Sequence, residues 1–417
     1  MKRQTYILGG GTFQPIRNHL ALCAPAFGTT AKTMKELMPE ATLILTKMAD
    51  SNVNLVTNED VERFIDTLIA SDYTGTIILN VAFCDYKALP IEGVESGIHA
   101  ERLKTSEGNI TVELTPTEKI IAKIRKARPD IFLVGFKTTT GKTSEEQFSI
   151  ALKTMKSVKC NLMFANDVVT RNNMIITAEE SIYGETTDRQ KALQELVDIT
   201  RMRQDLTYNK SEFIQEFSFD IKYRTPENFQ AVVQFLIDNG GFIENNSNGF
   251  TPGHFCYKDK DRHNVFFSSQ RKANHNLVFT EGMSEVSVVW KHLDLTKAEY
   301  AEETEPTFVV RGMRKASVGA RSQWLILKEN PDYDCIIHTH NPLKEGSLIP
   351  ITPQRPFQCG SLECGVNTVS HLGTFGPNIK AVYLEKHGAN ILFKSSQDPN
   401  EVIEFIKANL ELGTKVK

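Results

Sequence analysis

The first half of the chain alternates short apolar runs with amphipathic stretches, and this alternation restricts its fold more than any other feature. The apolar runs have the length of buried strands, and segments of helical pattern separate them. Strands that alternate with helices build βαβ units around a parallel sheet. We therefore predict an α/β fold with an N-terminal doubly wound, Rossmann-like parallel sheet. The expected strands are 5–8, 42–46, 76–82, 131–136 and 161–165, and the expected helices are 58–70, 117–127 and 144–157.

The second half has a different pattern. Residues 187–206 are charged and helical in pattern, residues 207–216 are polar, and less regularly spaced strand-like runs follow. We place the domain boundary there and predict two domains, 1–206 and 211–417. The pattern favours an α/β or α+β layer for the second domain over another doubly wound sheet. The expected elements include strands at 264–268, 287–290, 307–311, 334–338 and 379–384, and helices at 226–239 and 401–412.

Charge and hydropathy exclude several classes of partner. The 417 residues carry 48 basic and 51 acidic side chains, so no overall field attracts nucleic acid or an anionic membrane. No apolar run reaches the ~18–20 residues of a membrane helix, and the N-terminal apolar run is too short for a signal peptide. The seven cysteines contain no CxxC pair, which argues against a disulfide framework and a thiolate zinc site. We expect a cytoplasmic protein that binds small-molecule substrates, without nucleic acid or membrane partners.

Two loops of the first half invite a nucleotide interpretation, because ligands of parallel sheets bind where strands end. The loop at 9–12 (Gly-Gly-Gly-Thr) follows the first strand, although it lacks the G-x-G-x-x-G spacing. Residues 135–143 nearly match a P-loop, but five residues separate the two glycines where the motif needs four. One inserted residue re-aims the backbone amides. A solvated Lys/Thr loop is therefore favoured over a true P-loop.

Six short motifs follow one another along the first half. They are 9–12, 15–17 (Pro-Ile-Arg), 83–86 (Phe-Cys-Asp-Tyr), 99–104 (His-Ala-Glu-Arg-Leu-Lys), 134–136 (Val-Gly-Phe) and 165–168 (Ala-Asn-Asp-Val). This series resembles phosphopantothenate–cysteine ligase, the synthetase part of the pantothenate-metabolism flavoproteins, over about residues 5–196. The resemblance implies a ligase that activates the carboxylate of 4′-phosphopantothenate with CTP or ATP and Mg²⁺ and joins it to the amine of cysteine.

The same resemblance implies roles for single residues. Lys104 would meet the triphosphate, and Arg17 would meet the acyl or phosphate side of the substrate. The family's Ser-Asn-His-Ser-Ser-Gly motif is altered here, so either Asn18 is its displaced catalytic asparagine or that asparagine is lost. Each residue also has an ordinary alternative as a surface charge, core aromatic, turn or cap residue. The implied nucleotide contacts are Gly10, Gly11, Asp85, Lys104, Phe136, Asn166 and Asp167.

Histidines of the second half have the spacing of a metal site. His338 and His340 lie two apart after an apolar run, so their rings project on the same side, and His387 ends another apolar run. Three neutral imidazoles with an open position form a catalytic type of zinc site that polarises a carbonyl. Exposed or core histidines are the alternative. We predict that these three residues bind Zn²⁺ or another divalent metal.

The histidine pattern resembles the class II aldolase/adducin family over residues 211–417, and this resemblance implies an αβα domain. In the family's aldolases, a glutamate just before a helix moves the proton. That position falls near Gly319, and residues 315–323 contain no acid. Ser317 is expected to keep a phosphate contact. Glu363 is either a replacement acid or fourth ligand, or a structural residue, and the structural interpretation is favoured.

Together these patterns predict a bifunctional small-molecule enzyme. Its first domain would be a CTP-type, nucleotide-dependent acid–amine ligase, and its second a zinc-dependent, aldolase-like lyase acting on a carbonyl or phospho-sugar substrate. Two alternatives stay open: a catalytically inactive binding or scaffolding protein of the adducin kind, and a metal-dependent lyase whose first domain only assembles the oligomer. Both families commonly form symmetric oligomers, so a homo-oligomer is expected by analogy.

Overall fold

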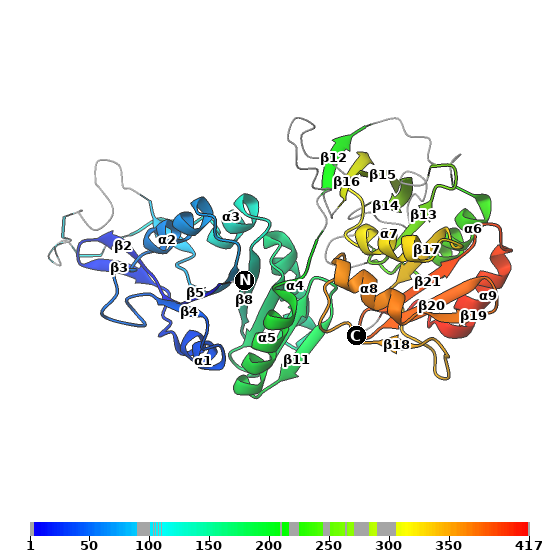
Figure 1. Ribbon diagram of the computed structural model, residues 1–417. Helices are drawn as coiled ribbons and strands as arrows, with labels where there is room; N and C mark the ends of the chain where they lie inside the picture. The colour runs from blue at the N-terminus through cyan, green and yellow to red at the C-terminus, as the bar shows by residue number, and fades with distance from the viewer. Residues whose placement is uncertain are drawn as a thin grey trace, which may run out of the picture. The chain divides into compact units, whose positions relative to one another are not determined.

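The computed structural model divides the chain into two compact units (Figure 1). Unit 1 is Met1–Asp205 and unit 2 is Leu206–Lys417. The structure describes residues 4–89, 101–102, 104, 106, 108–109, 111–208, 211–216, 225–244, 251–262, 265–270, 283–289 and 306–415.

Unit 1 is built on a seven-stranded sheet. From one edge to the other its strands are β11 (Ile182–Thr186), β10 (Asn173–Thr177), β9 (Leu162–Asp167), β8 (Phe132–Thr139), β5 (Thr76–Ala82), β1 (Thr5–Gly11) and β4 (Thr42–Leu45). The last five are parallel, whereas β10 and β11 join by antiparallel pairing. Counted along the chain, the parallel strands have the order 2-1-3-4-5, the order of flavodoxin-like sheets. The α/β fold class is confirmed.

Helices cover both faces of this sheet, so it is doubly wound. The strand residues alternate between two cores: Ile7 and Ile78 face one, and Leu8 and Leu79 face the other. Thr57 and Thr143 start their helices with reciprocal capping boxes, which fixes where the two helices begin. The first core is closed by α1 (Thr29–Leu37) and α5 (Arg189–Arg203), and the second by α2 (Asn58–Ala70), α3 (Ile120–Ala127) and α4 (Ser144–Val158).

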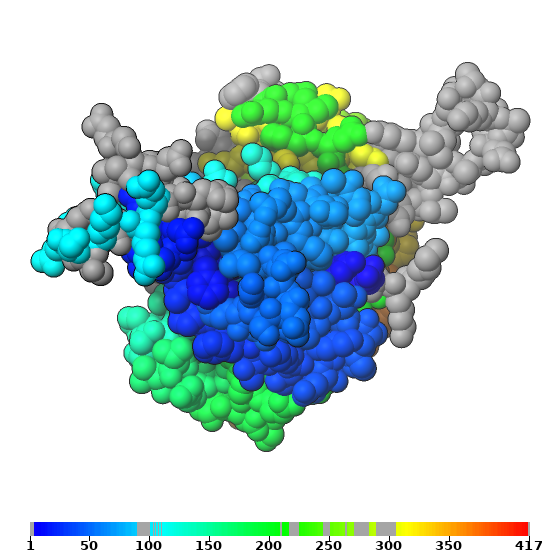
Figure 2. All heavy atoms as spheres, turned by 90° about the vertical axis from the view of Figure 1, so that its left-hand side faces the viewer, coloured from blue at the N-terminus to red at the C-terminus, as the bar shows by residue number. Residues whose placement is uncertain are grey.

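The chain leaves β1 toward α1 on one face, and it enters β5 from α2 on the other. The carboxyl ends of β1 and β5 therefore flank the topological switch point, where open α/β sheets bind ligands. Two hairpins that the sequence analysis did not predict follow these strand ends. They are β2 (Phe13–Arg17) with β3 (Leu20–Cys23), and β6 (Tyr86–Ala88) with β7 (Leu114–Pro116). Figure 2 shows the cyan region that contains β7 beside the blue surface of unit 1.

The described residues of unit 2 form a ten-stranded sheet with mostly antiparallel pairing. The strands in order are β12 (Ser211–Gln215), β16 (Thr307–Gly312), β15 (Met283–Val289), β14 (Val265–Ser269), β13 (His254–Lys258), β17 (Cys335–Thr339), β21 (Gly388–Phe393), β20 (Ile379–Leu384) and β18 (Ile351–Thr352), with β19 (Gly373–Phe375) paired to β20. Only β12–β16 and β18–β20 pair in parallel among these described strands.

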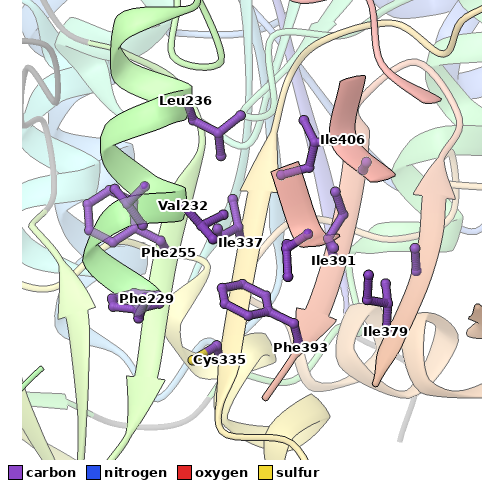
Figure 3. Packing of buried hydrophobic residues seen from close by; sticks show 14 of the residues in the cluster. Phe229, Val232, Leu236, Phe255, Cys335, Ile337, Ile379, Ile391, Phe393 and Ile406 are labelled. Carbon is purple, nitrogen blue, oxygen red and sulfur yellow. The ribbon is translucent and has the colours of Figure 1, made fainter. Parts of the chain in front are cut away.

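Two helix layers enclose the sheet of unit 2, which gives the expected αβα architecture. On one face, three side chains of α6 (Glu227–Asp238) point toward Ile337 and Phe393 on the strands (Figure 3). They are Phe229, Val232 and Leu236. The opposite core packs Ile326 and Leu327 against the other face. The first layer contains α6 (Glu227–Asp238) and α9 (Pro399–Asn409), and the second contains α7 (Ala320–Glu329) and α8 (Leu362–Ser370).

None of the helices among the described residues is both long enough and apolar enough to span a bilayer.

A fully buried ion pair ties α5 to the sheet of unit 1. The Nη1 atom of Arg203 lies 3.0 Å from a carboxylate oxygen of Glu179, and neither side chain is accessible to solvent. Replacing Arg203 with methionine leaves Glu179 buried without this partner, so we expect Arg203→Met to lower the free energy of unfolding of unit 1 by about 3–5 kcal/mol. Hydrogen exchange of the α5 backbone amides in the full chain measures the effect.

Arg201→Met is the matched control. Arg201 lies on α5, as Arg203 does, but its ion pair with Glu40 is solvent-exposed. Such exposed pairs contribute only about 0–1 kcal/mol. Equal exchange rates in Arg203→Met and Arg201→Met would show that the buried pair has no special role.

Candidate functional sites

Three histidines gather at the ends of two central strands of the unit 2 sheet. His338 lies near the end of β17, His340 follows that strand, and His387 precedes β21. Their ligand atoms all lie within 4.8 Å of one another, and 3.3 Å separates Nε2 of His338 from Nε2 of His387. Two nitrogens bound tetrahedrally to zinc lie about 3.4 Å apart, given Zn–N bonds of about 2.1 Å. The His338–His387 pair has about this separation, so the three residues could hold a divalent metal.

Backbone and burial prepare the first of these rings for metal binding. Nδ1 of His338 lies 3.1 Å from the carbonyl oxygen of Ala389 and donates its proton there, so the Nε2 lone pair faces the cluster. This tautomer is assigned from the carbonyl, which can only accept. Burial, reinforced by His387, lowers the pKa of His338 and of His340 well below the usual range. Neutral imidazole is the form that coordinates metals.

The structure defines the positions of the three other residues discussed for this site, Gly319, Ser317 and Glu363. Gly319 caps the N-terminus of α7. Ser317, two residues earlier, is half-buried, and its backbone N–H donates to the carbonyl of Ser269. The carboxylate of Glu363 accepts from the backbone N–H of Thr207, which lies 3.0 Å from each of its oxygens. Glu363 therefore anchors the start of unit 2, as its structural interpretation expects.

A fourth histidine beside the group escaped the sequence analysis. His254 begins β13 and pairs in register with His338, and the centroids of the two rings lie 4.8 Å apart. It is only 5% exposed. One signal was available, because His254 directly precedes the short apolar run 255–257, as a histidine does at the end of a buried strand.

In unit 1, the glycine loop after β1 is covered by the chain itself. A Cβ atom on Gly10 would lie 2.2 Å from Oγ1 of Thr46, and one on Gly11 would lie 2.0 Å from the carbonyl oxygen of Ala24. The N–H of Gly11 donates to the carbonyl of Ala26 at 2.7 Å. Close packing against these segments explains both glycines, and a nucleotide contact at either one stays a prediction.

A buried polar junction closes the switch point between β1 and β5. Oγ1 of Thr12 donates to Oδ1 of Asn58 at 2.6 Å, and the backbone N–H of Cys84 lies within 3.2 Å of both oxygens. Nδ2 of Asn58 in turn donates to the carbonyl of Cys84 at 2.8 Å. This network joins the ends of β1 and β5 to the start of α2. Local sequence pattern does not predict this network, because the three residues are far apart in the chain.

Arg17 is an unusual charge on the hairpin that follows β1. It ends β2, is 6% exposed, and its Nη1 atom has no hydrogen-bond partner among the described residues. Buried cations are normally paired, so Arg17 is suited to hold an anion. Its neighbour Asn18 is exposed.

Two further implied residues, Asp85 and Lys104, belong to the β6–β7 side and are solvent-exposed. Asp85 lies 3.6 Å from Nζ of Lys119 in a surface ion pair. Lys104 is also exposed, and of the predicted motif 99–104 only residues 101, 102 and 104 lie within the described part of the chain. Their catalytic and nucleotide roles stay predictions.

The loops after β8 and β9 are held by one carboxylate. Asp167, which is 2% exposed, accepts hydrogen bonds from Oγ1 of Thr139 and from the backbone N–H groups of Gly141, Lys142, Val169 and Thr170 at 2.9–3.0 Å. The amides that a P-loop would aim at phosphate are thus directed at Asp167. This excludes the P-loop interpretation of residues 135–143.

Two further implied residues lie near Asp167. Asn166 accepts from Oγ1 of Thr138 at 3.4 Å. Phe136 is half-buried and packs against Phe164, with ring centroids 5.3 Å apart. The guanidinium of Arg189 lies over the Phe164 ring at 4.7 Å. Phe136 therefore makes the contact expected of a core aromatic residue. Its role beside a nucleotide base stays a prediction.

The arrangement defines unit 1 as a doubly wound α/β domain with its switch point between β1 and β5. Residues 30–202 match the family model described as DNA/pantothenate metabolism flavoprotein C-terminal domain. A segment is 29% identical over 132 residues to the coenzyme A biosynthesis bifunctional protein CoaBC of Thermococcus kodakarensis, covering 30% of this chain and 31% of the relative. The chain thus spans about a third of that relative. The resemblance predicted for residues 5–196 is confirmed from residue 30 onward, and the motifs at 9–12 and 15–17 lie outside the matched range.

Two solved structures are similar to parts of this chain. The DNA/pantothenate metabolism flavoprotein from Streptococcus pneumoniae has a TM-score of 0.38 and 21% identity, covering 47% of this chain and 96% of its own. An L-fuculose 1-phosphate aldolase has a TM-score of 0.29 and 14% identity, covering 46% of this chain and 83% of its own. The assignment of unit 2 to the class II aldolase family stays a prediction.

The Asp167 network makes unit 1 sensitive to acid. Burial alone would raise the pKa of Asp167, but hydrogen bonds from the backbone of Lys142 and Thr170 and from Thr139 hold it well below its usual range. A lowered pKa in the folded state stabilises the fold above the unfolded value of about 3.9, and this contribution is lost as the pH falls below it. We expect Asp167→Asn to be less stable at pH 7 and to show a flatter decline below about pH 4.

Thermal unfolding of the full chain, followed by circular dichroism from pH 7 to 3, measures this difference. Asp85→Asn is the matched control, because Asp85 is exposed, and it should unfold like the wild type at each pH. An Asp167→Asn protein with the wild-type acid profile would remove Asp167 as the source of the sensitivity.

Proposed function

We propose that the chain is a bifunctional small-molecule enzyme in which a nucleotide-dependent acid–amine ligase is joined to a metal-dependent lyase. The histidine group of unit 2 supports this proposal most strongly, because three ligand atoms within 4.8 Å suit a catalytic metal. The family match over residues 30–202 supports the ligase half. We expect small-molecule substrates, a cytoplasmic location and a homo-oligomer.

In the lyase half, His338, His340 and His387 would hold Zn²⁺ or another divalent metal. When bound, such a metal polarises a carbonyl oxygen of a sugar-like substrate. Ser317, near the N-terminus of α7, would contact a substrate phosphate, since helix N-termini favour anions. Gly319 brings no acid to the site, so another side chain has to face the reacting oxygen atoms.

In the ligase half, Arg17 would hold the carboxylate or phosphate of the acid substrate. Its burial, together with the Nη1 atom that no described residue accepts from, supports this role. Lys104 would meet the triphosphate of CTP or ATP with its Mg²⁺, and Asn18 would assist amide formation. Gly10, Gly11, Asp85, Phe136, Asn166 and Asp167 would contact the nucleotide; for Asp167 the contact is through the loop that its carboxylate shapes.

One observation favours a second candidate, a metal-dependent lyase whose first unit only assembles the oligomer. The glycine loop after β1 is filled by the chain's own residues, since Gly11 donates to Ala26 and Gly10 packs on Thr46. This candidate retains metal binding and predicts no nucleotide binding.

Metal content tests the lyase half. After dialysis, plasma emission spectrometry should find about one divalent ion per chain in the wild type. The double variant His338→Ala/His340→Ala should hold almost none, because a metal centre loses most of its affinity when two of its three ligands are removed. His19→Ala is the matched control, as His19 is exposed in unit 1, and it should keep the ion. A double variant with the wild-type metal content would refute the assignment.

Calorimetric titration with CTP and with ATP in the presence of Mg²⁺ tests the ligase half. We expect one nucleotide to bind, and Lys104→Ala to weaken it about tenfold or more, the value of a lost charge-assisted hydrogen bond. Lys153→Ala is the control, because Lys153 is an exposed lysine on α4. Absence of binding to the wild type would favour the second candidate, and unchanged binding in Lys104→Ala would remove that lysine from the site.

A further inference from the structure

The imidazole of His254 fills the space that a side chain at position 319 would need. A Cβ atom built on Gly319 would lie 1.9 Å from Nε2 and 2.1 Å from Cε1 of His254. Non-bonded carbon atoms pack at about 3.5–4.0 Å, so both groups cannot be present together. The ring therefore stands at the N-terminus of α7, where the chain carries no side chain of its own.

The sheet places the same ring against the histidine group. β13 and β17 are antiparallel neighbours, and His254 lies directly opposite His338. Opposed residues of such strands project to the same face, and the two ring centroids are 4.8 Å apart. His254 is not one of the three residues whose ligand atoms converge within 4.8 Å. His254 thus lies beside the three histidines and is not a fourth member of the converging set.

We propose that His254 contacts the small molecule bound at the proposed metal centre. This inference rests on the metal function proposed above. A three-histidine centre keeps an open position for an oxygen ligand. A buried ring beside it has hydrogen-bonding nitrogens that can reach a second oxygen of that ligand. His254 thereby selects compounds with two adjacent oxygen atoms, such as a hydroxy-carbonyl group, and it comes from a strand instead of from the helix that begins after Gly319.

The geometry separates this role from simple packing. A packing role needs only a flat ring of similar size, whereas the proposed contact needs a polar atom near the position of Nε2. Phenylalanine supplies the first without the second, and glutamine supplies the second without the ring. Because His338, His340 and His387 are left unchanged, either substitution should leave the metal in place.

Acetohydroxamate, which binds metals through two adjacent oxygens, is the probe. The full-length protein is loaded with Co²⁺, and the visible absorption of the metal reports probe binding. We expect His254→Phe to bind Co²⁺ in the wild-type ratio but to bind acetohydroxamate about tenfold more weakly, the effect of one lost hydrogen bond. His254→Gln should bind the probe nearly as well as the wild type.

Gly319→Ala provides an independent test, because it leaves His254 intact and forces the ring away from its position. It should also weaken acetohydroxamate while the metal ratio stays at the wild-type value. Wild-type probe affinity in His254→Phe, or loss of Co²⁺ from His254→Phe and His254→Gln alike, would overturn the proposal. A wild-type protein that binds no Co²⁺ would instead refute the metal function, so the two failures are distinguishable.

Discussion

The pairing register of β17 with its two neighbours determines where the chemistry of unit 2 can occur. His338 lies opposite His254 on β13 and opposite Asn390 on β21. Because the side chains of a strand alternate between faces, a slip of one residue would turn His338 toward the apolar core beneath α6 and α9. Ile337 and Phe393 are buried in that core, so the slip would cost stability, and the histidines stay where β17 ends and β21 begins.

Unit 1 positions its loops by a different principle, a single buried anion that gathers backbone donors. Asp167 collects the amides of two successive strand ends, much as a phosphate would in a P-loop. At the switch point, the neutral oxygens of Thr12 and Asn58 both accept from the backbone N–H of Cys84. The loops of both strand ends are therefore shaped before any ligand arrives. Arg17, on the hairpin that follows β1, has an Nη1 atom without a hydrogen-bond partner among the described residues.

Much of the fold follows from local pattern. The strand at 76–82 and the helix at 58–70 have the predicted limits, because each is bounded by strong signals, a capping box in the case of the helix. The antiparallel β10 and β11 and the two hairpins were not predicted, since their short runs depend on partners that only the folded sheet supplies. The three metal-type histidines were found from spacing. His254 was missed because it lies 84 residues from His338 in the chain, and only strand pairing brings them together.

The shared space of His254 and Gly319 also restricts how this site can change through mutation. A carboxylate cannot be introduced at position 319 while the imidazole occupies that space, and removing the imidazole first leaves the position empty. The two residues are therefore coupled, and their combined substitution is expected to differ from the sum of the single ones. A sequence that carries an acid at the start of α7 should have a small residue at the start of β13, and such paired exchange can be sought among natural variants of this chain.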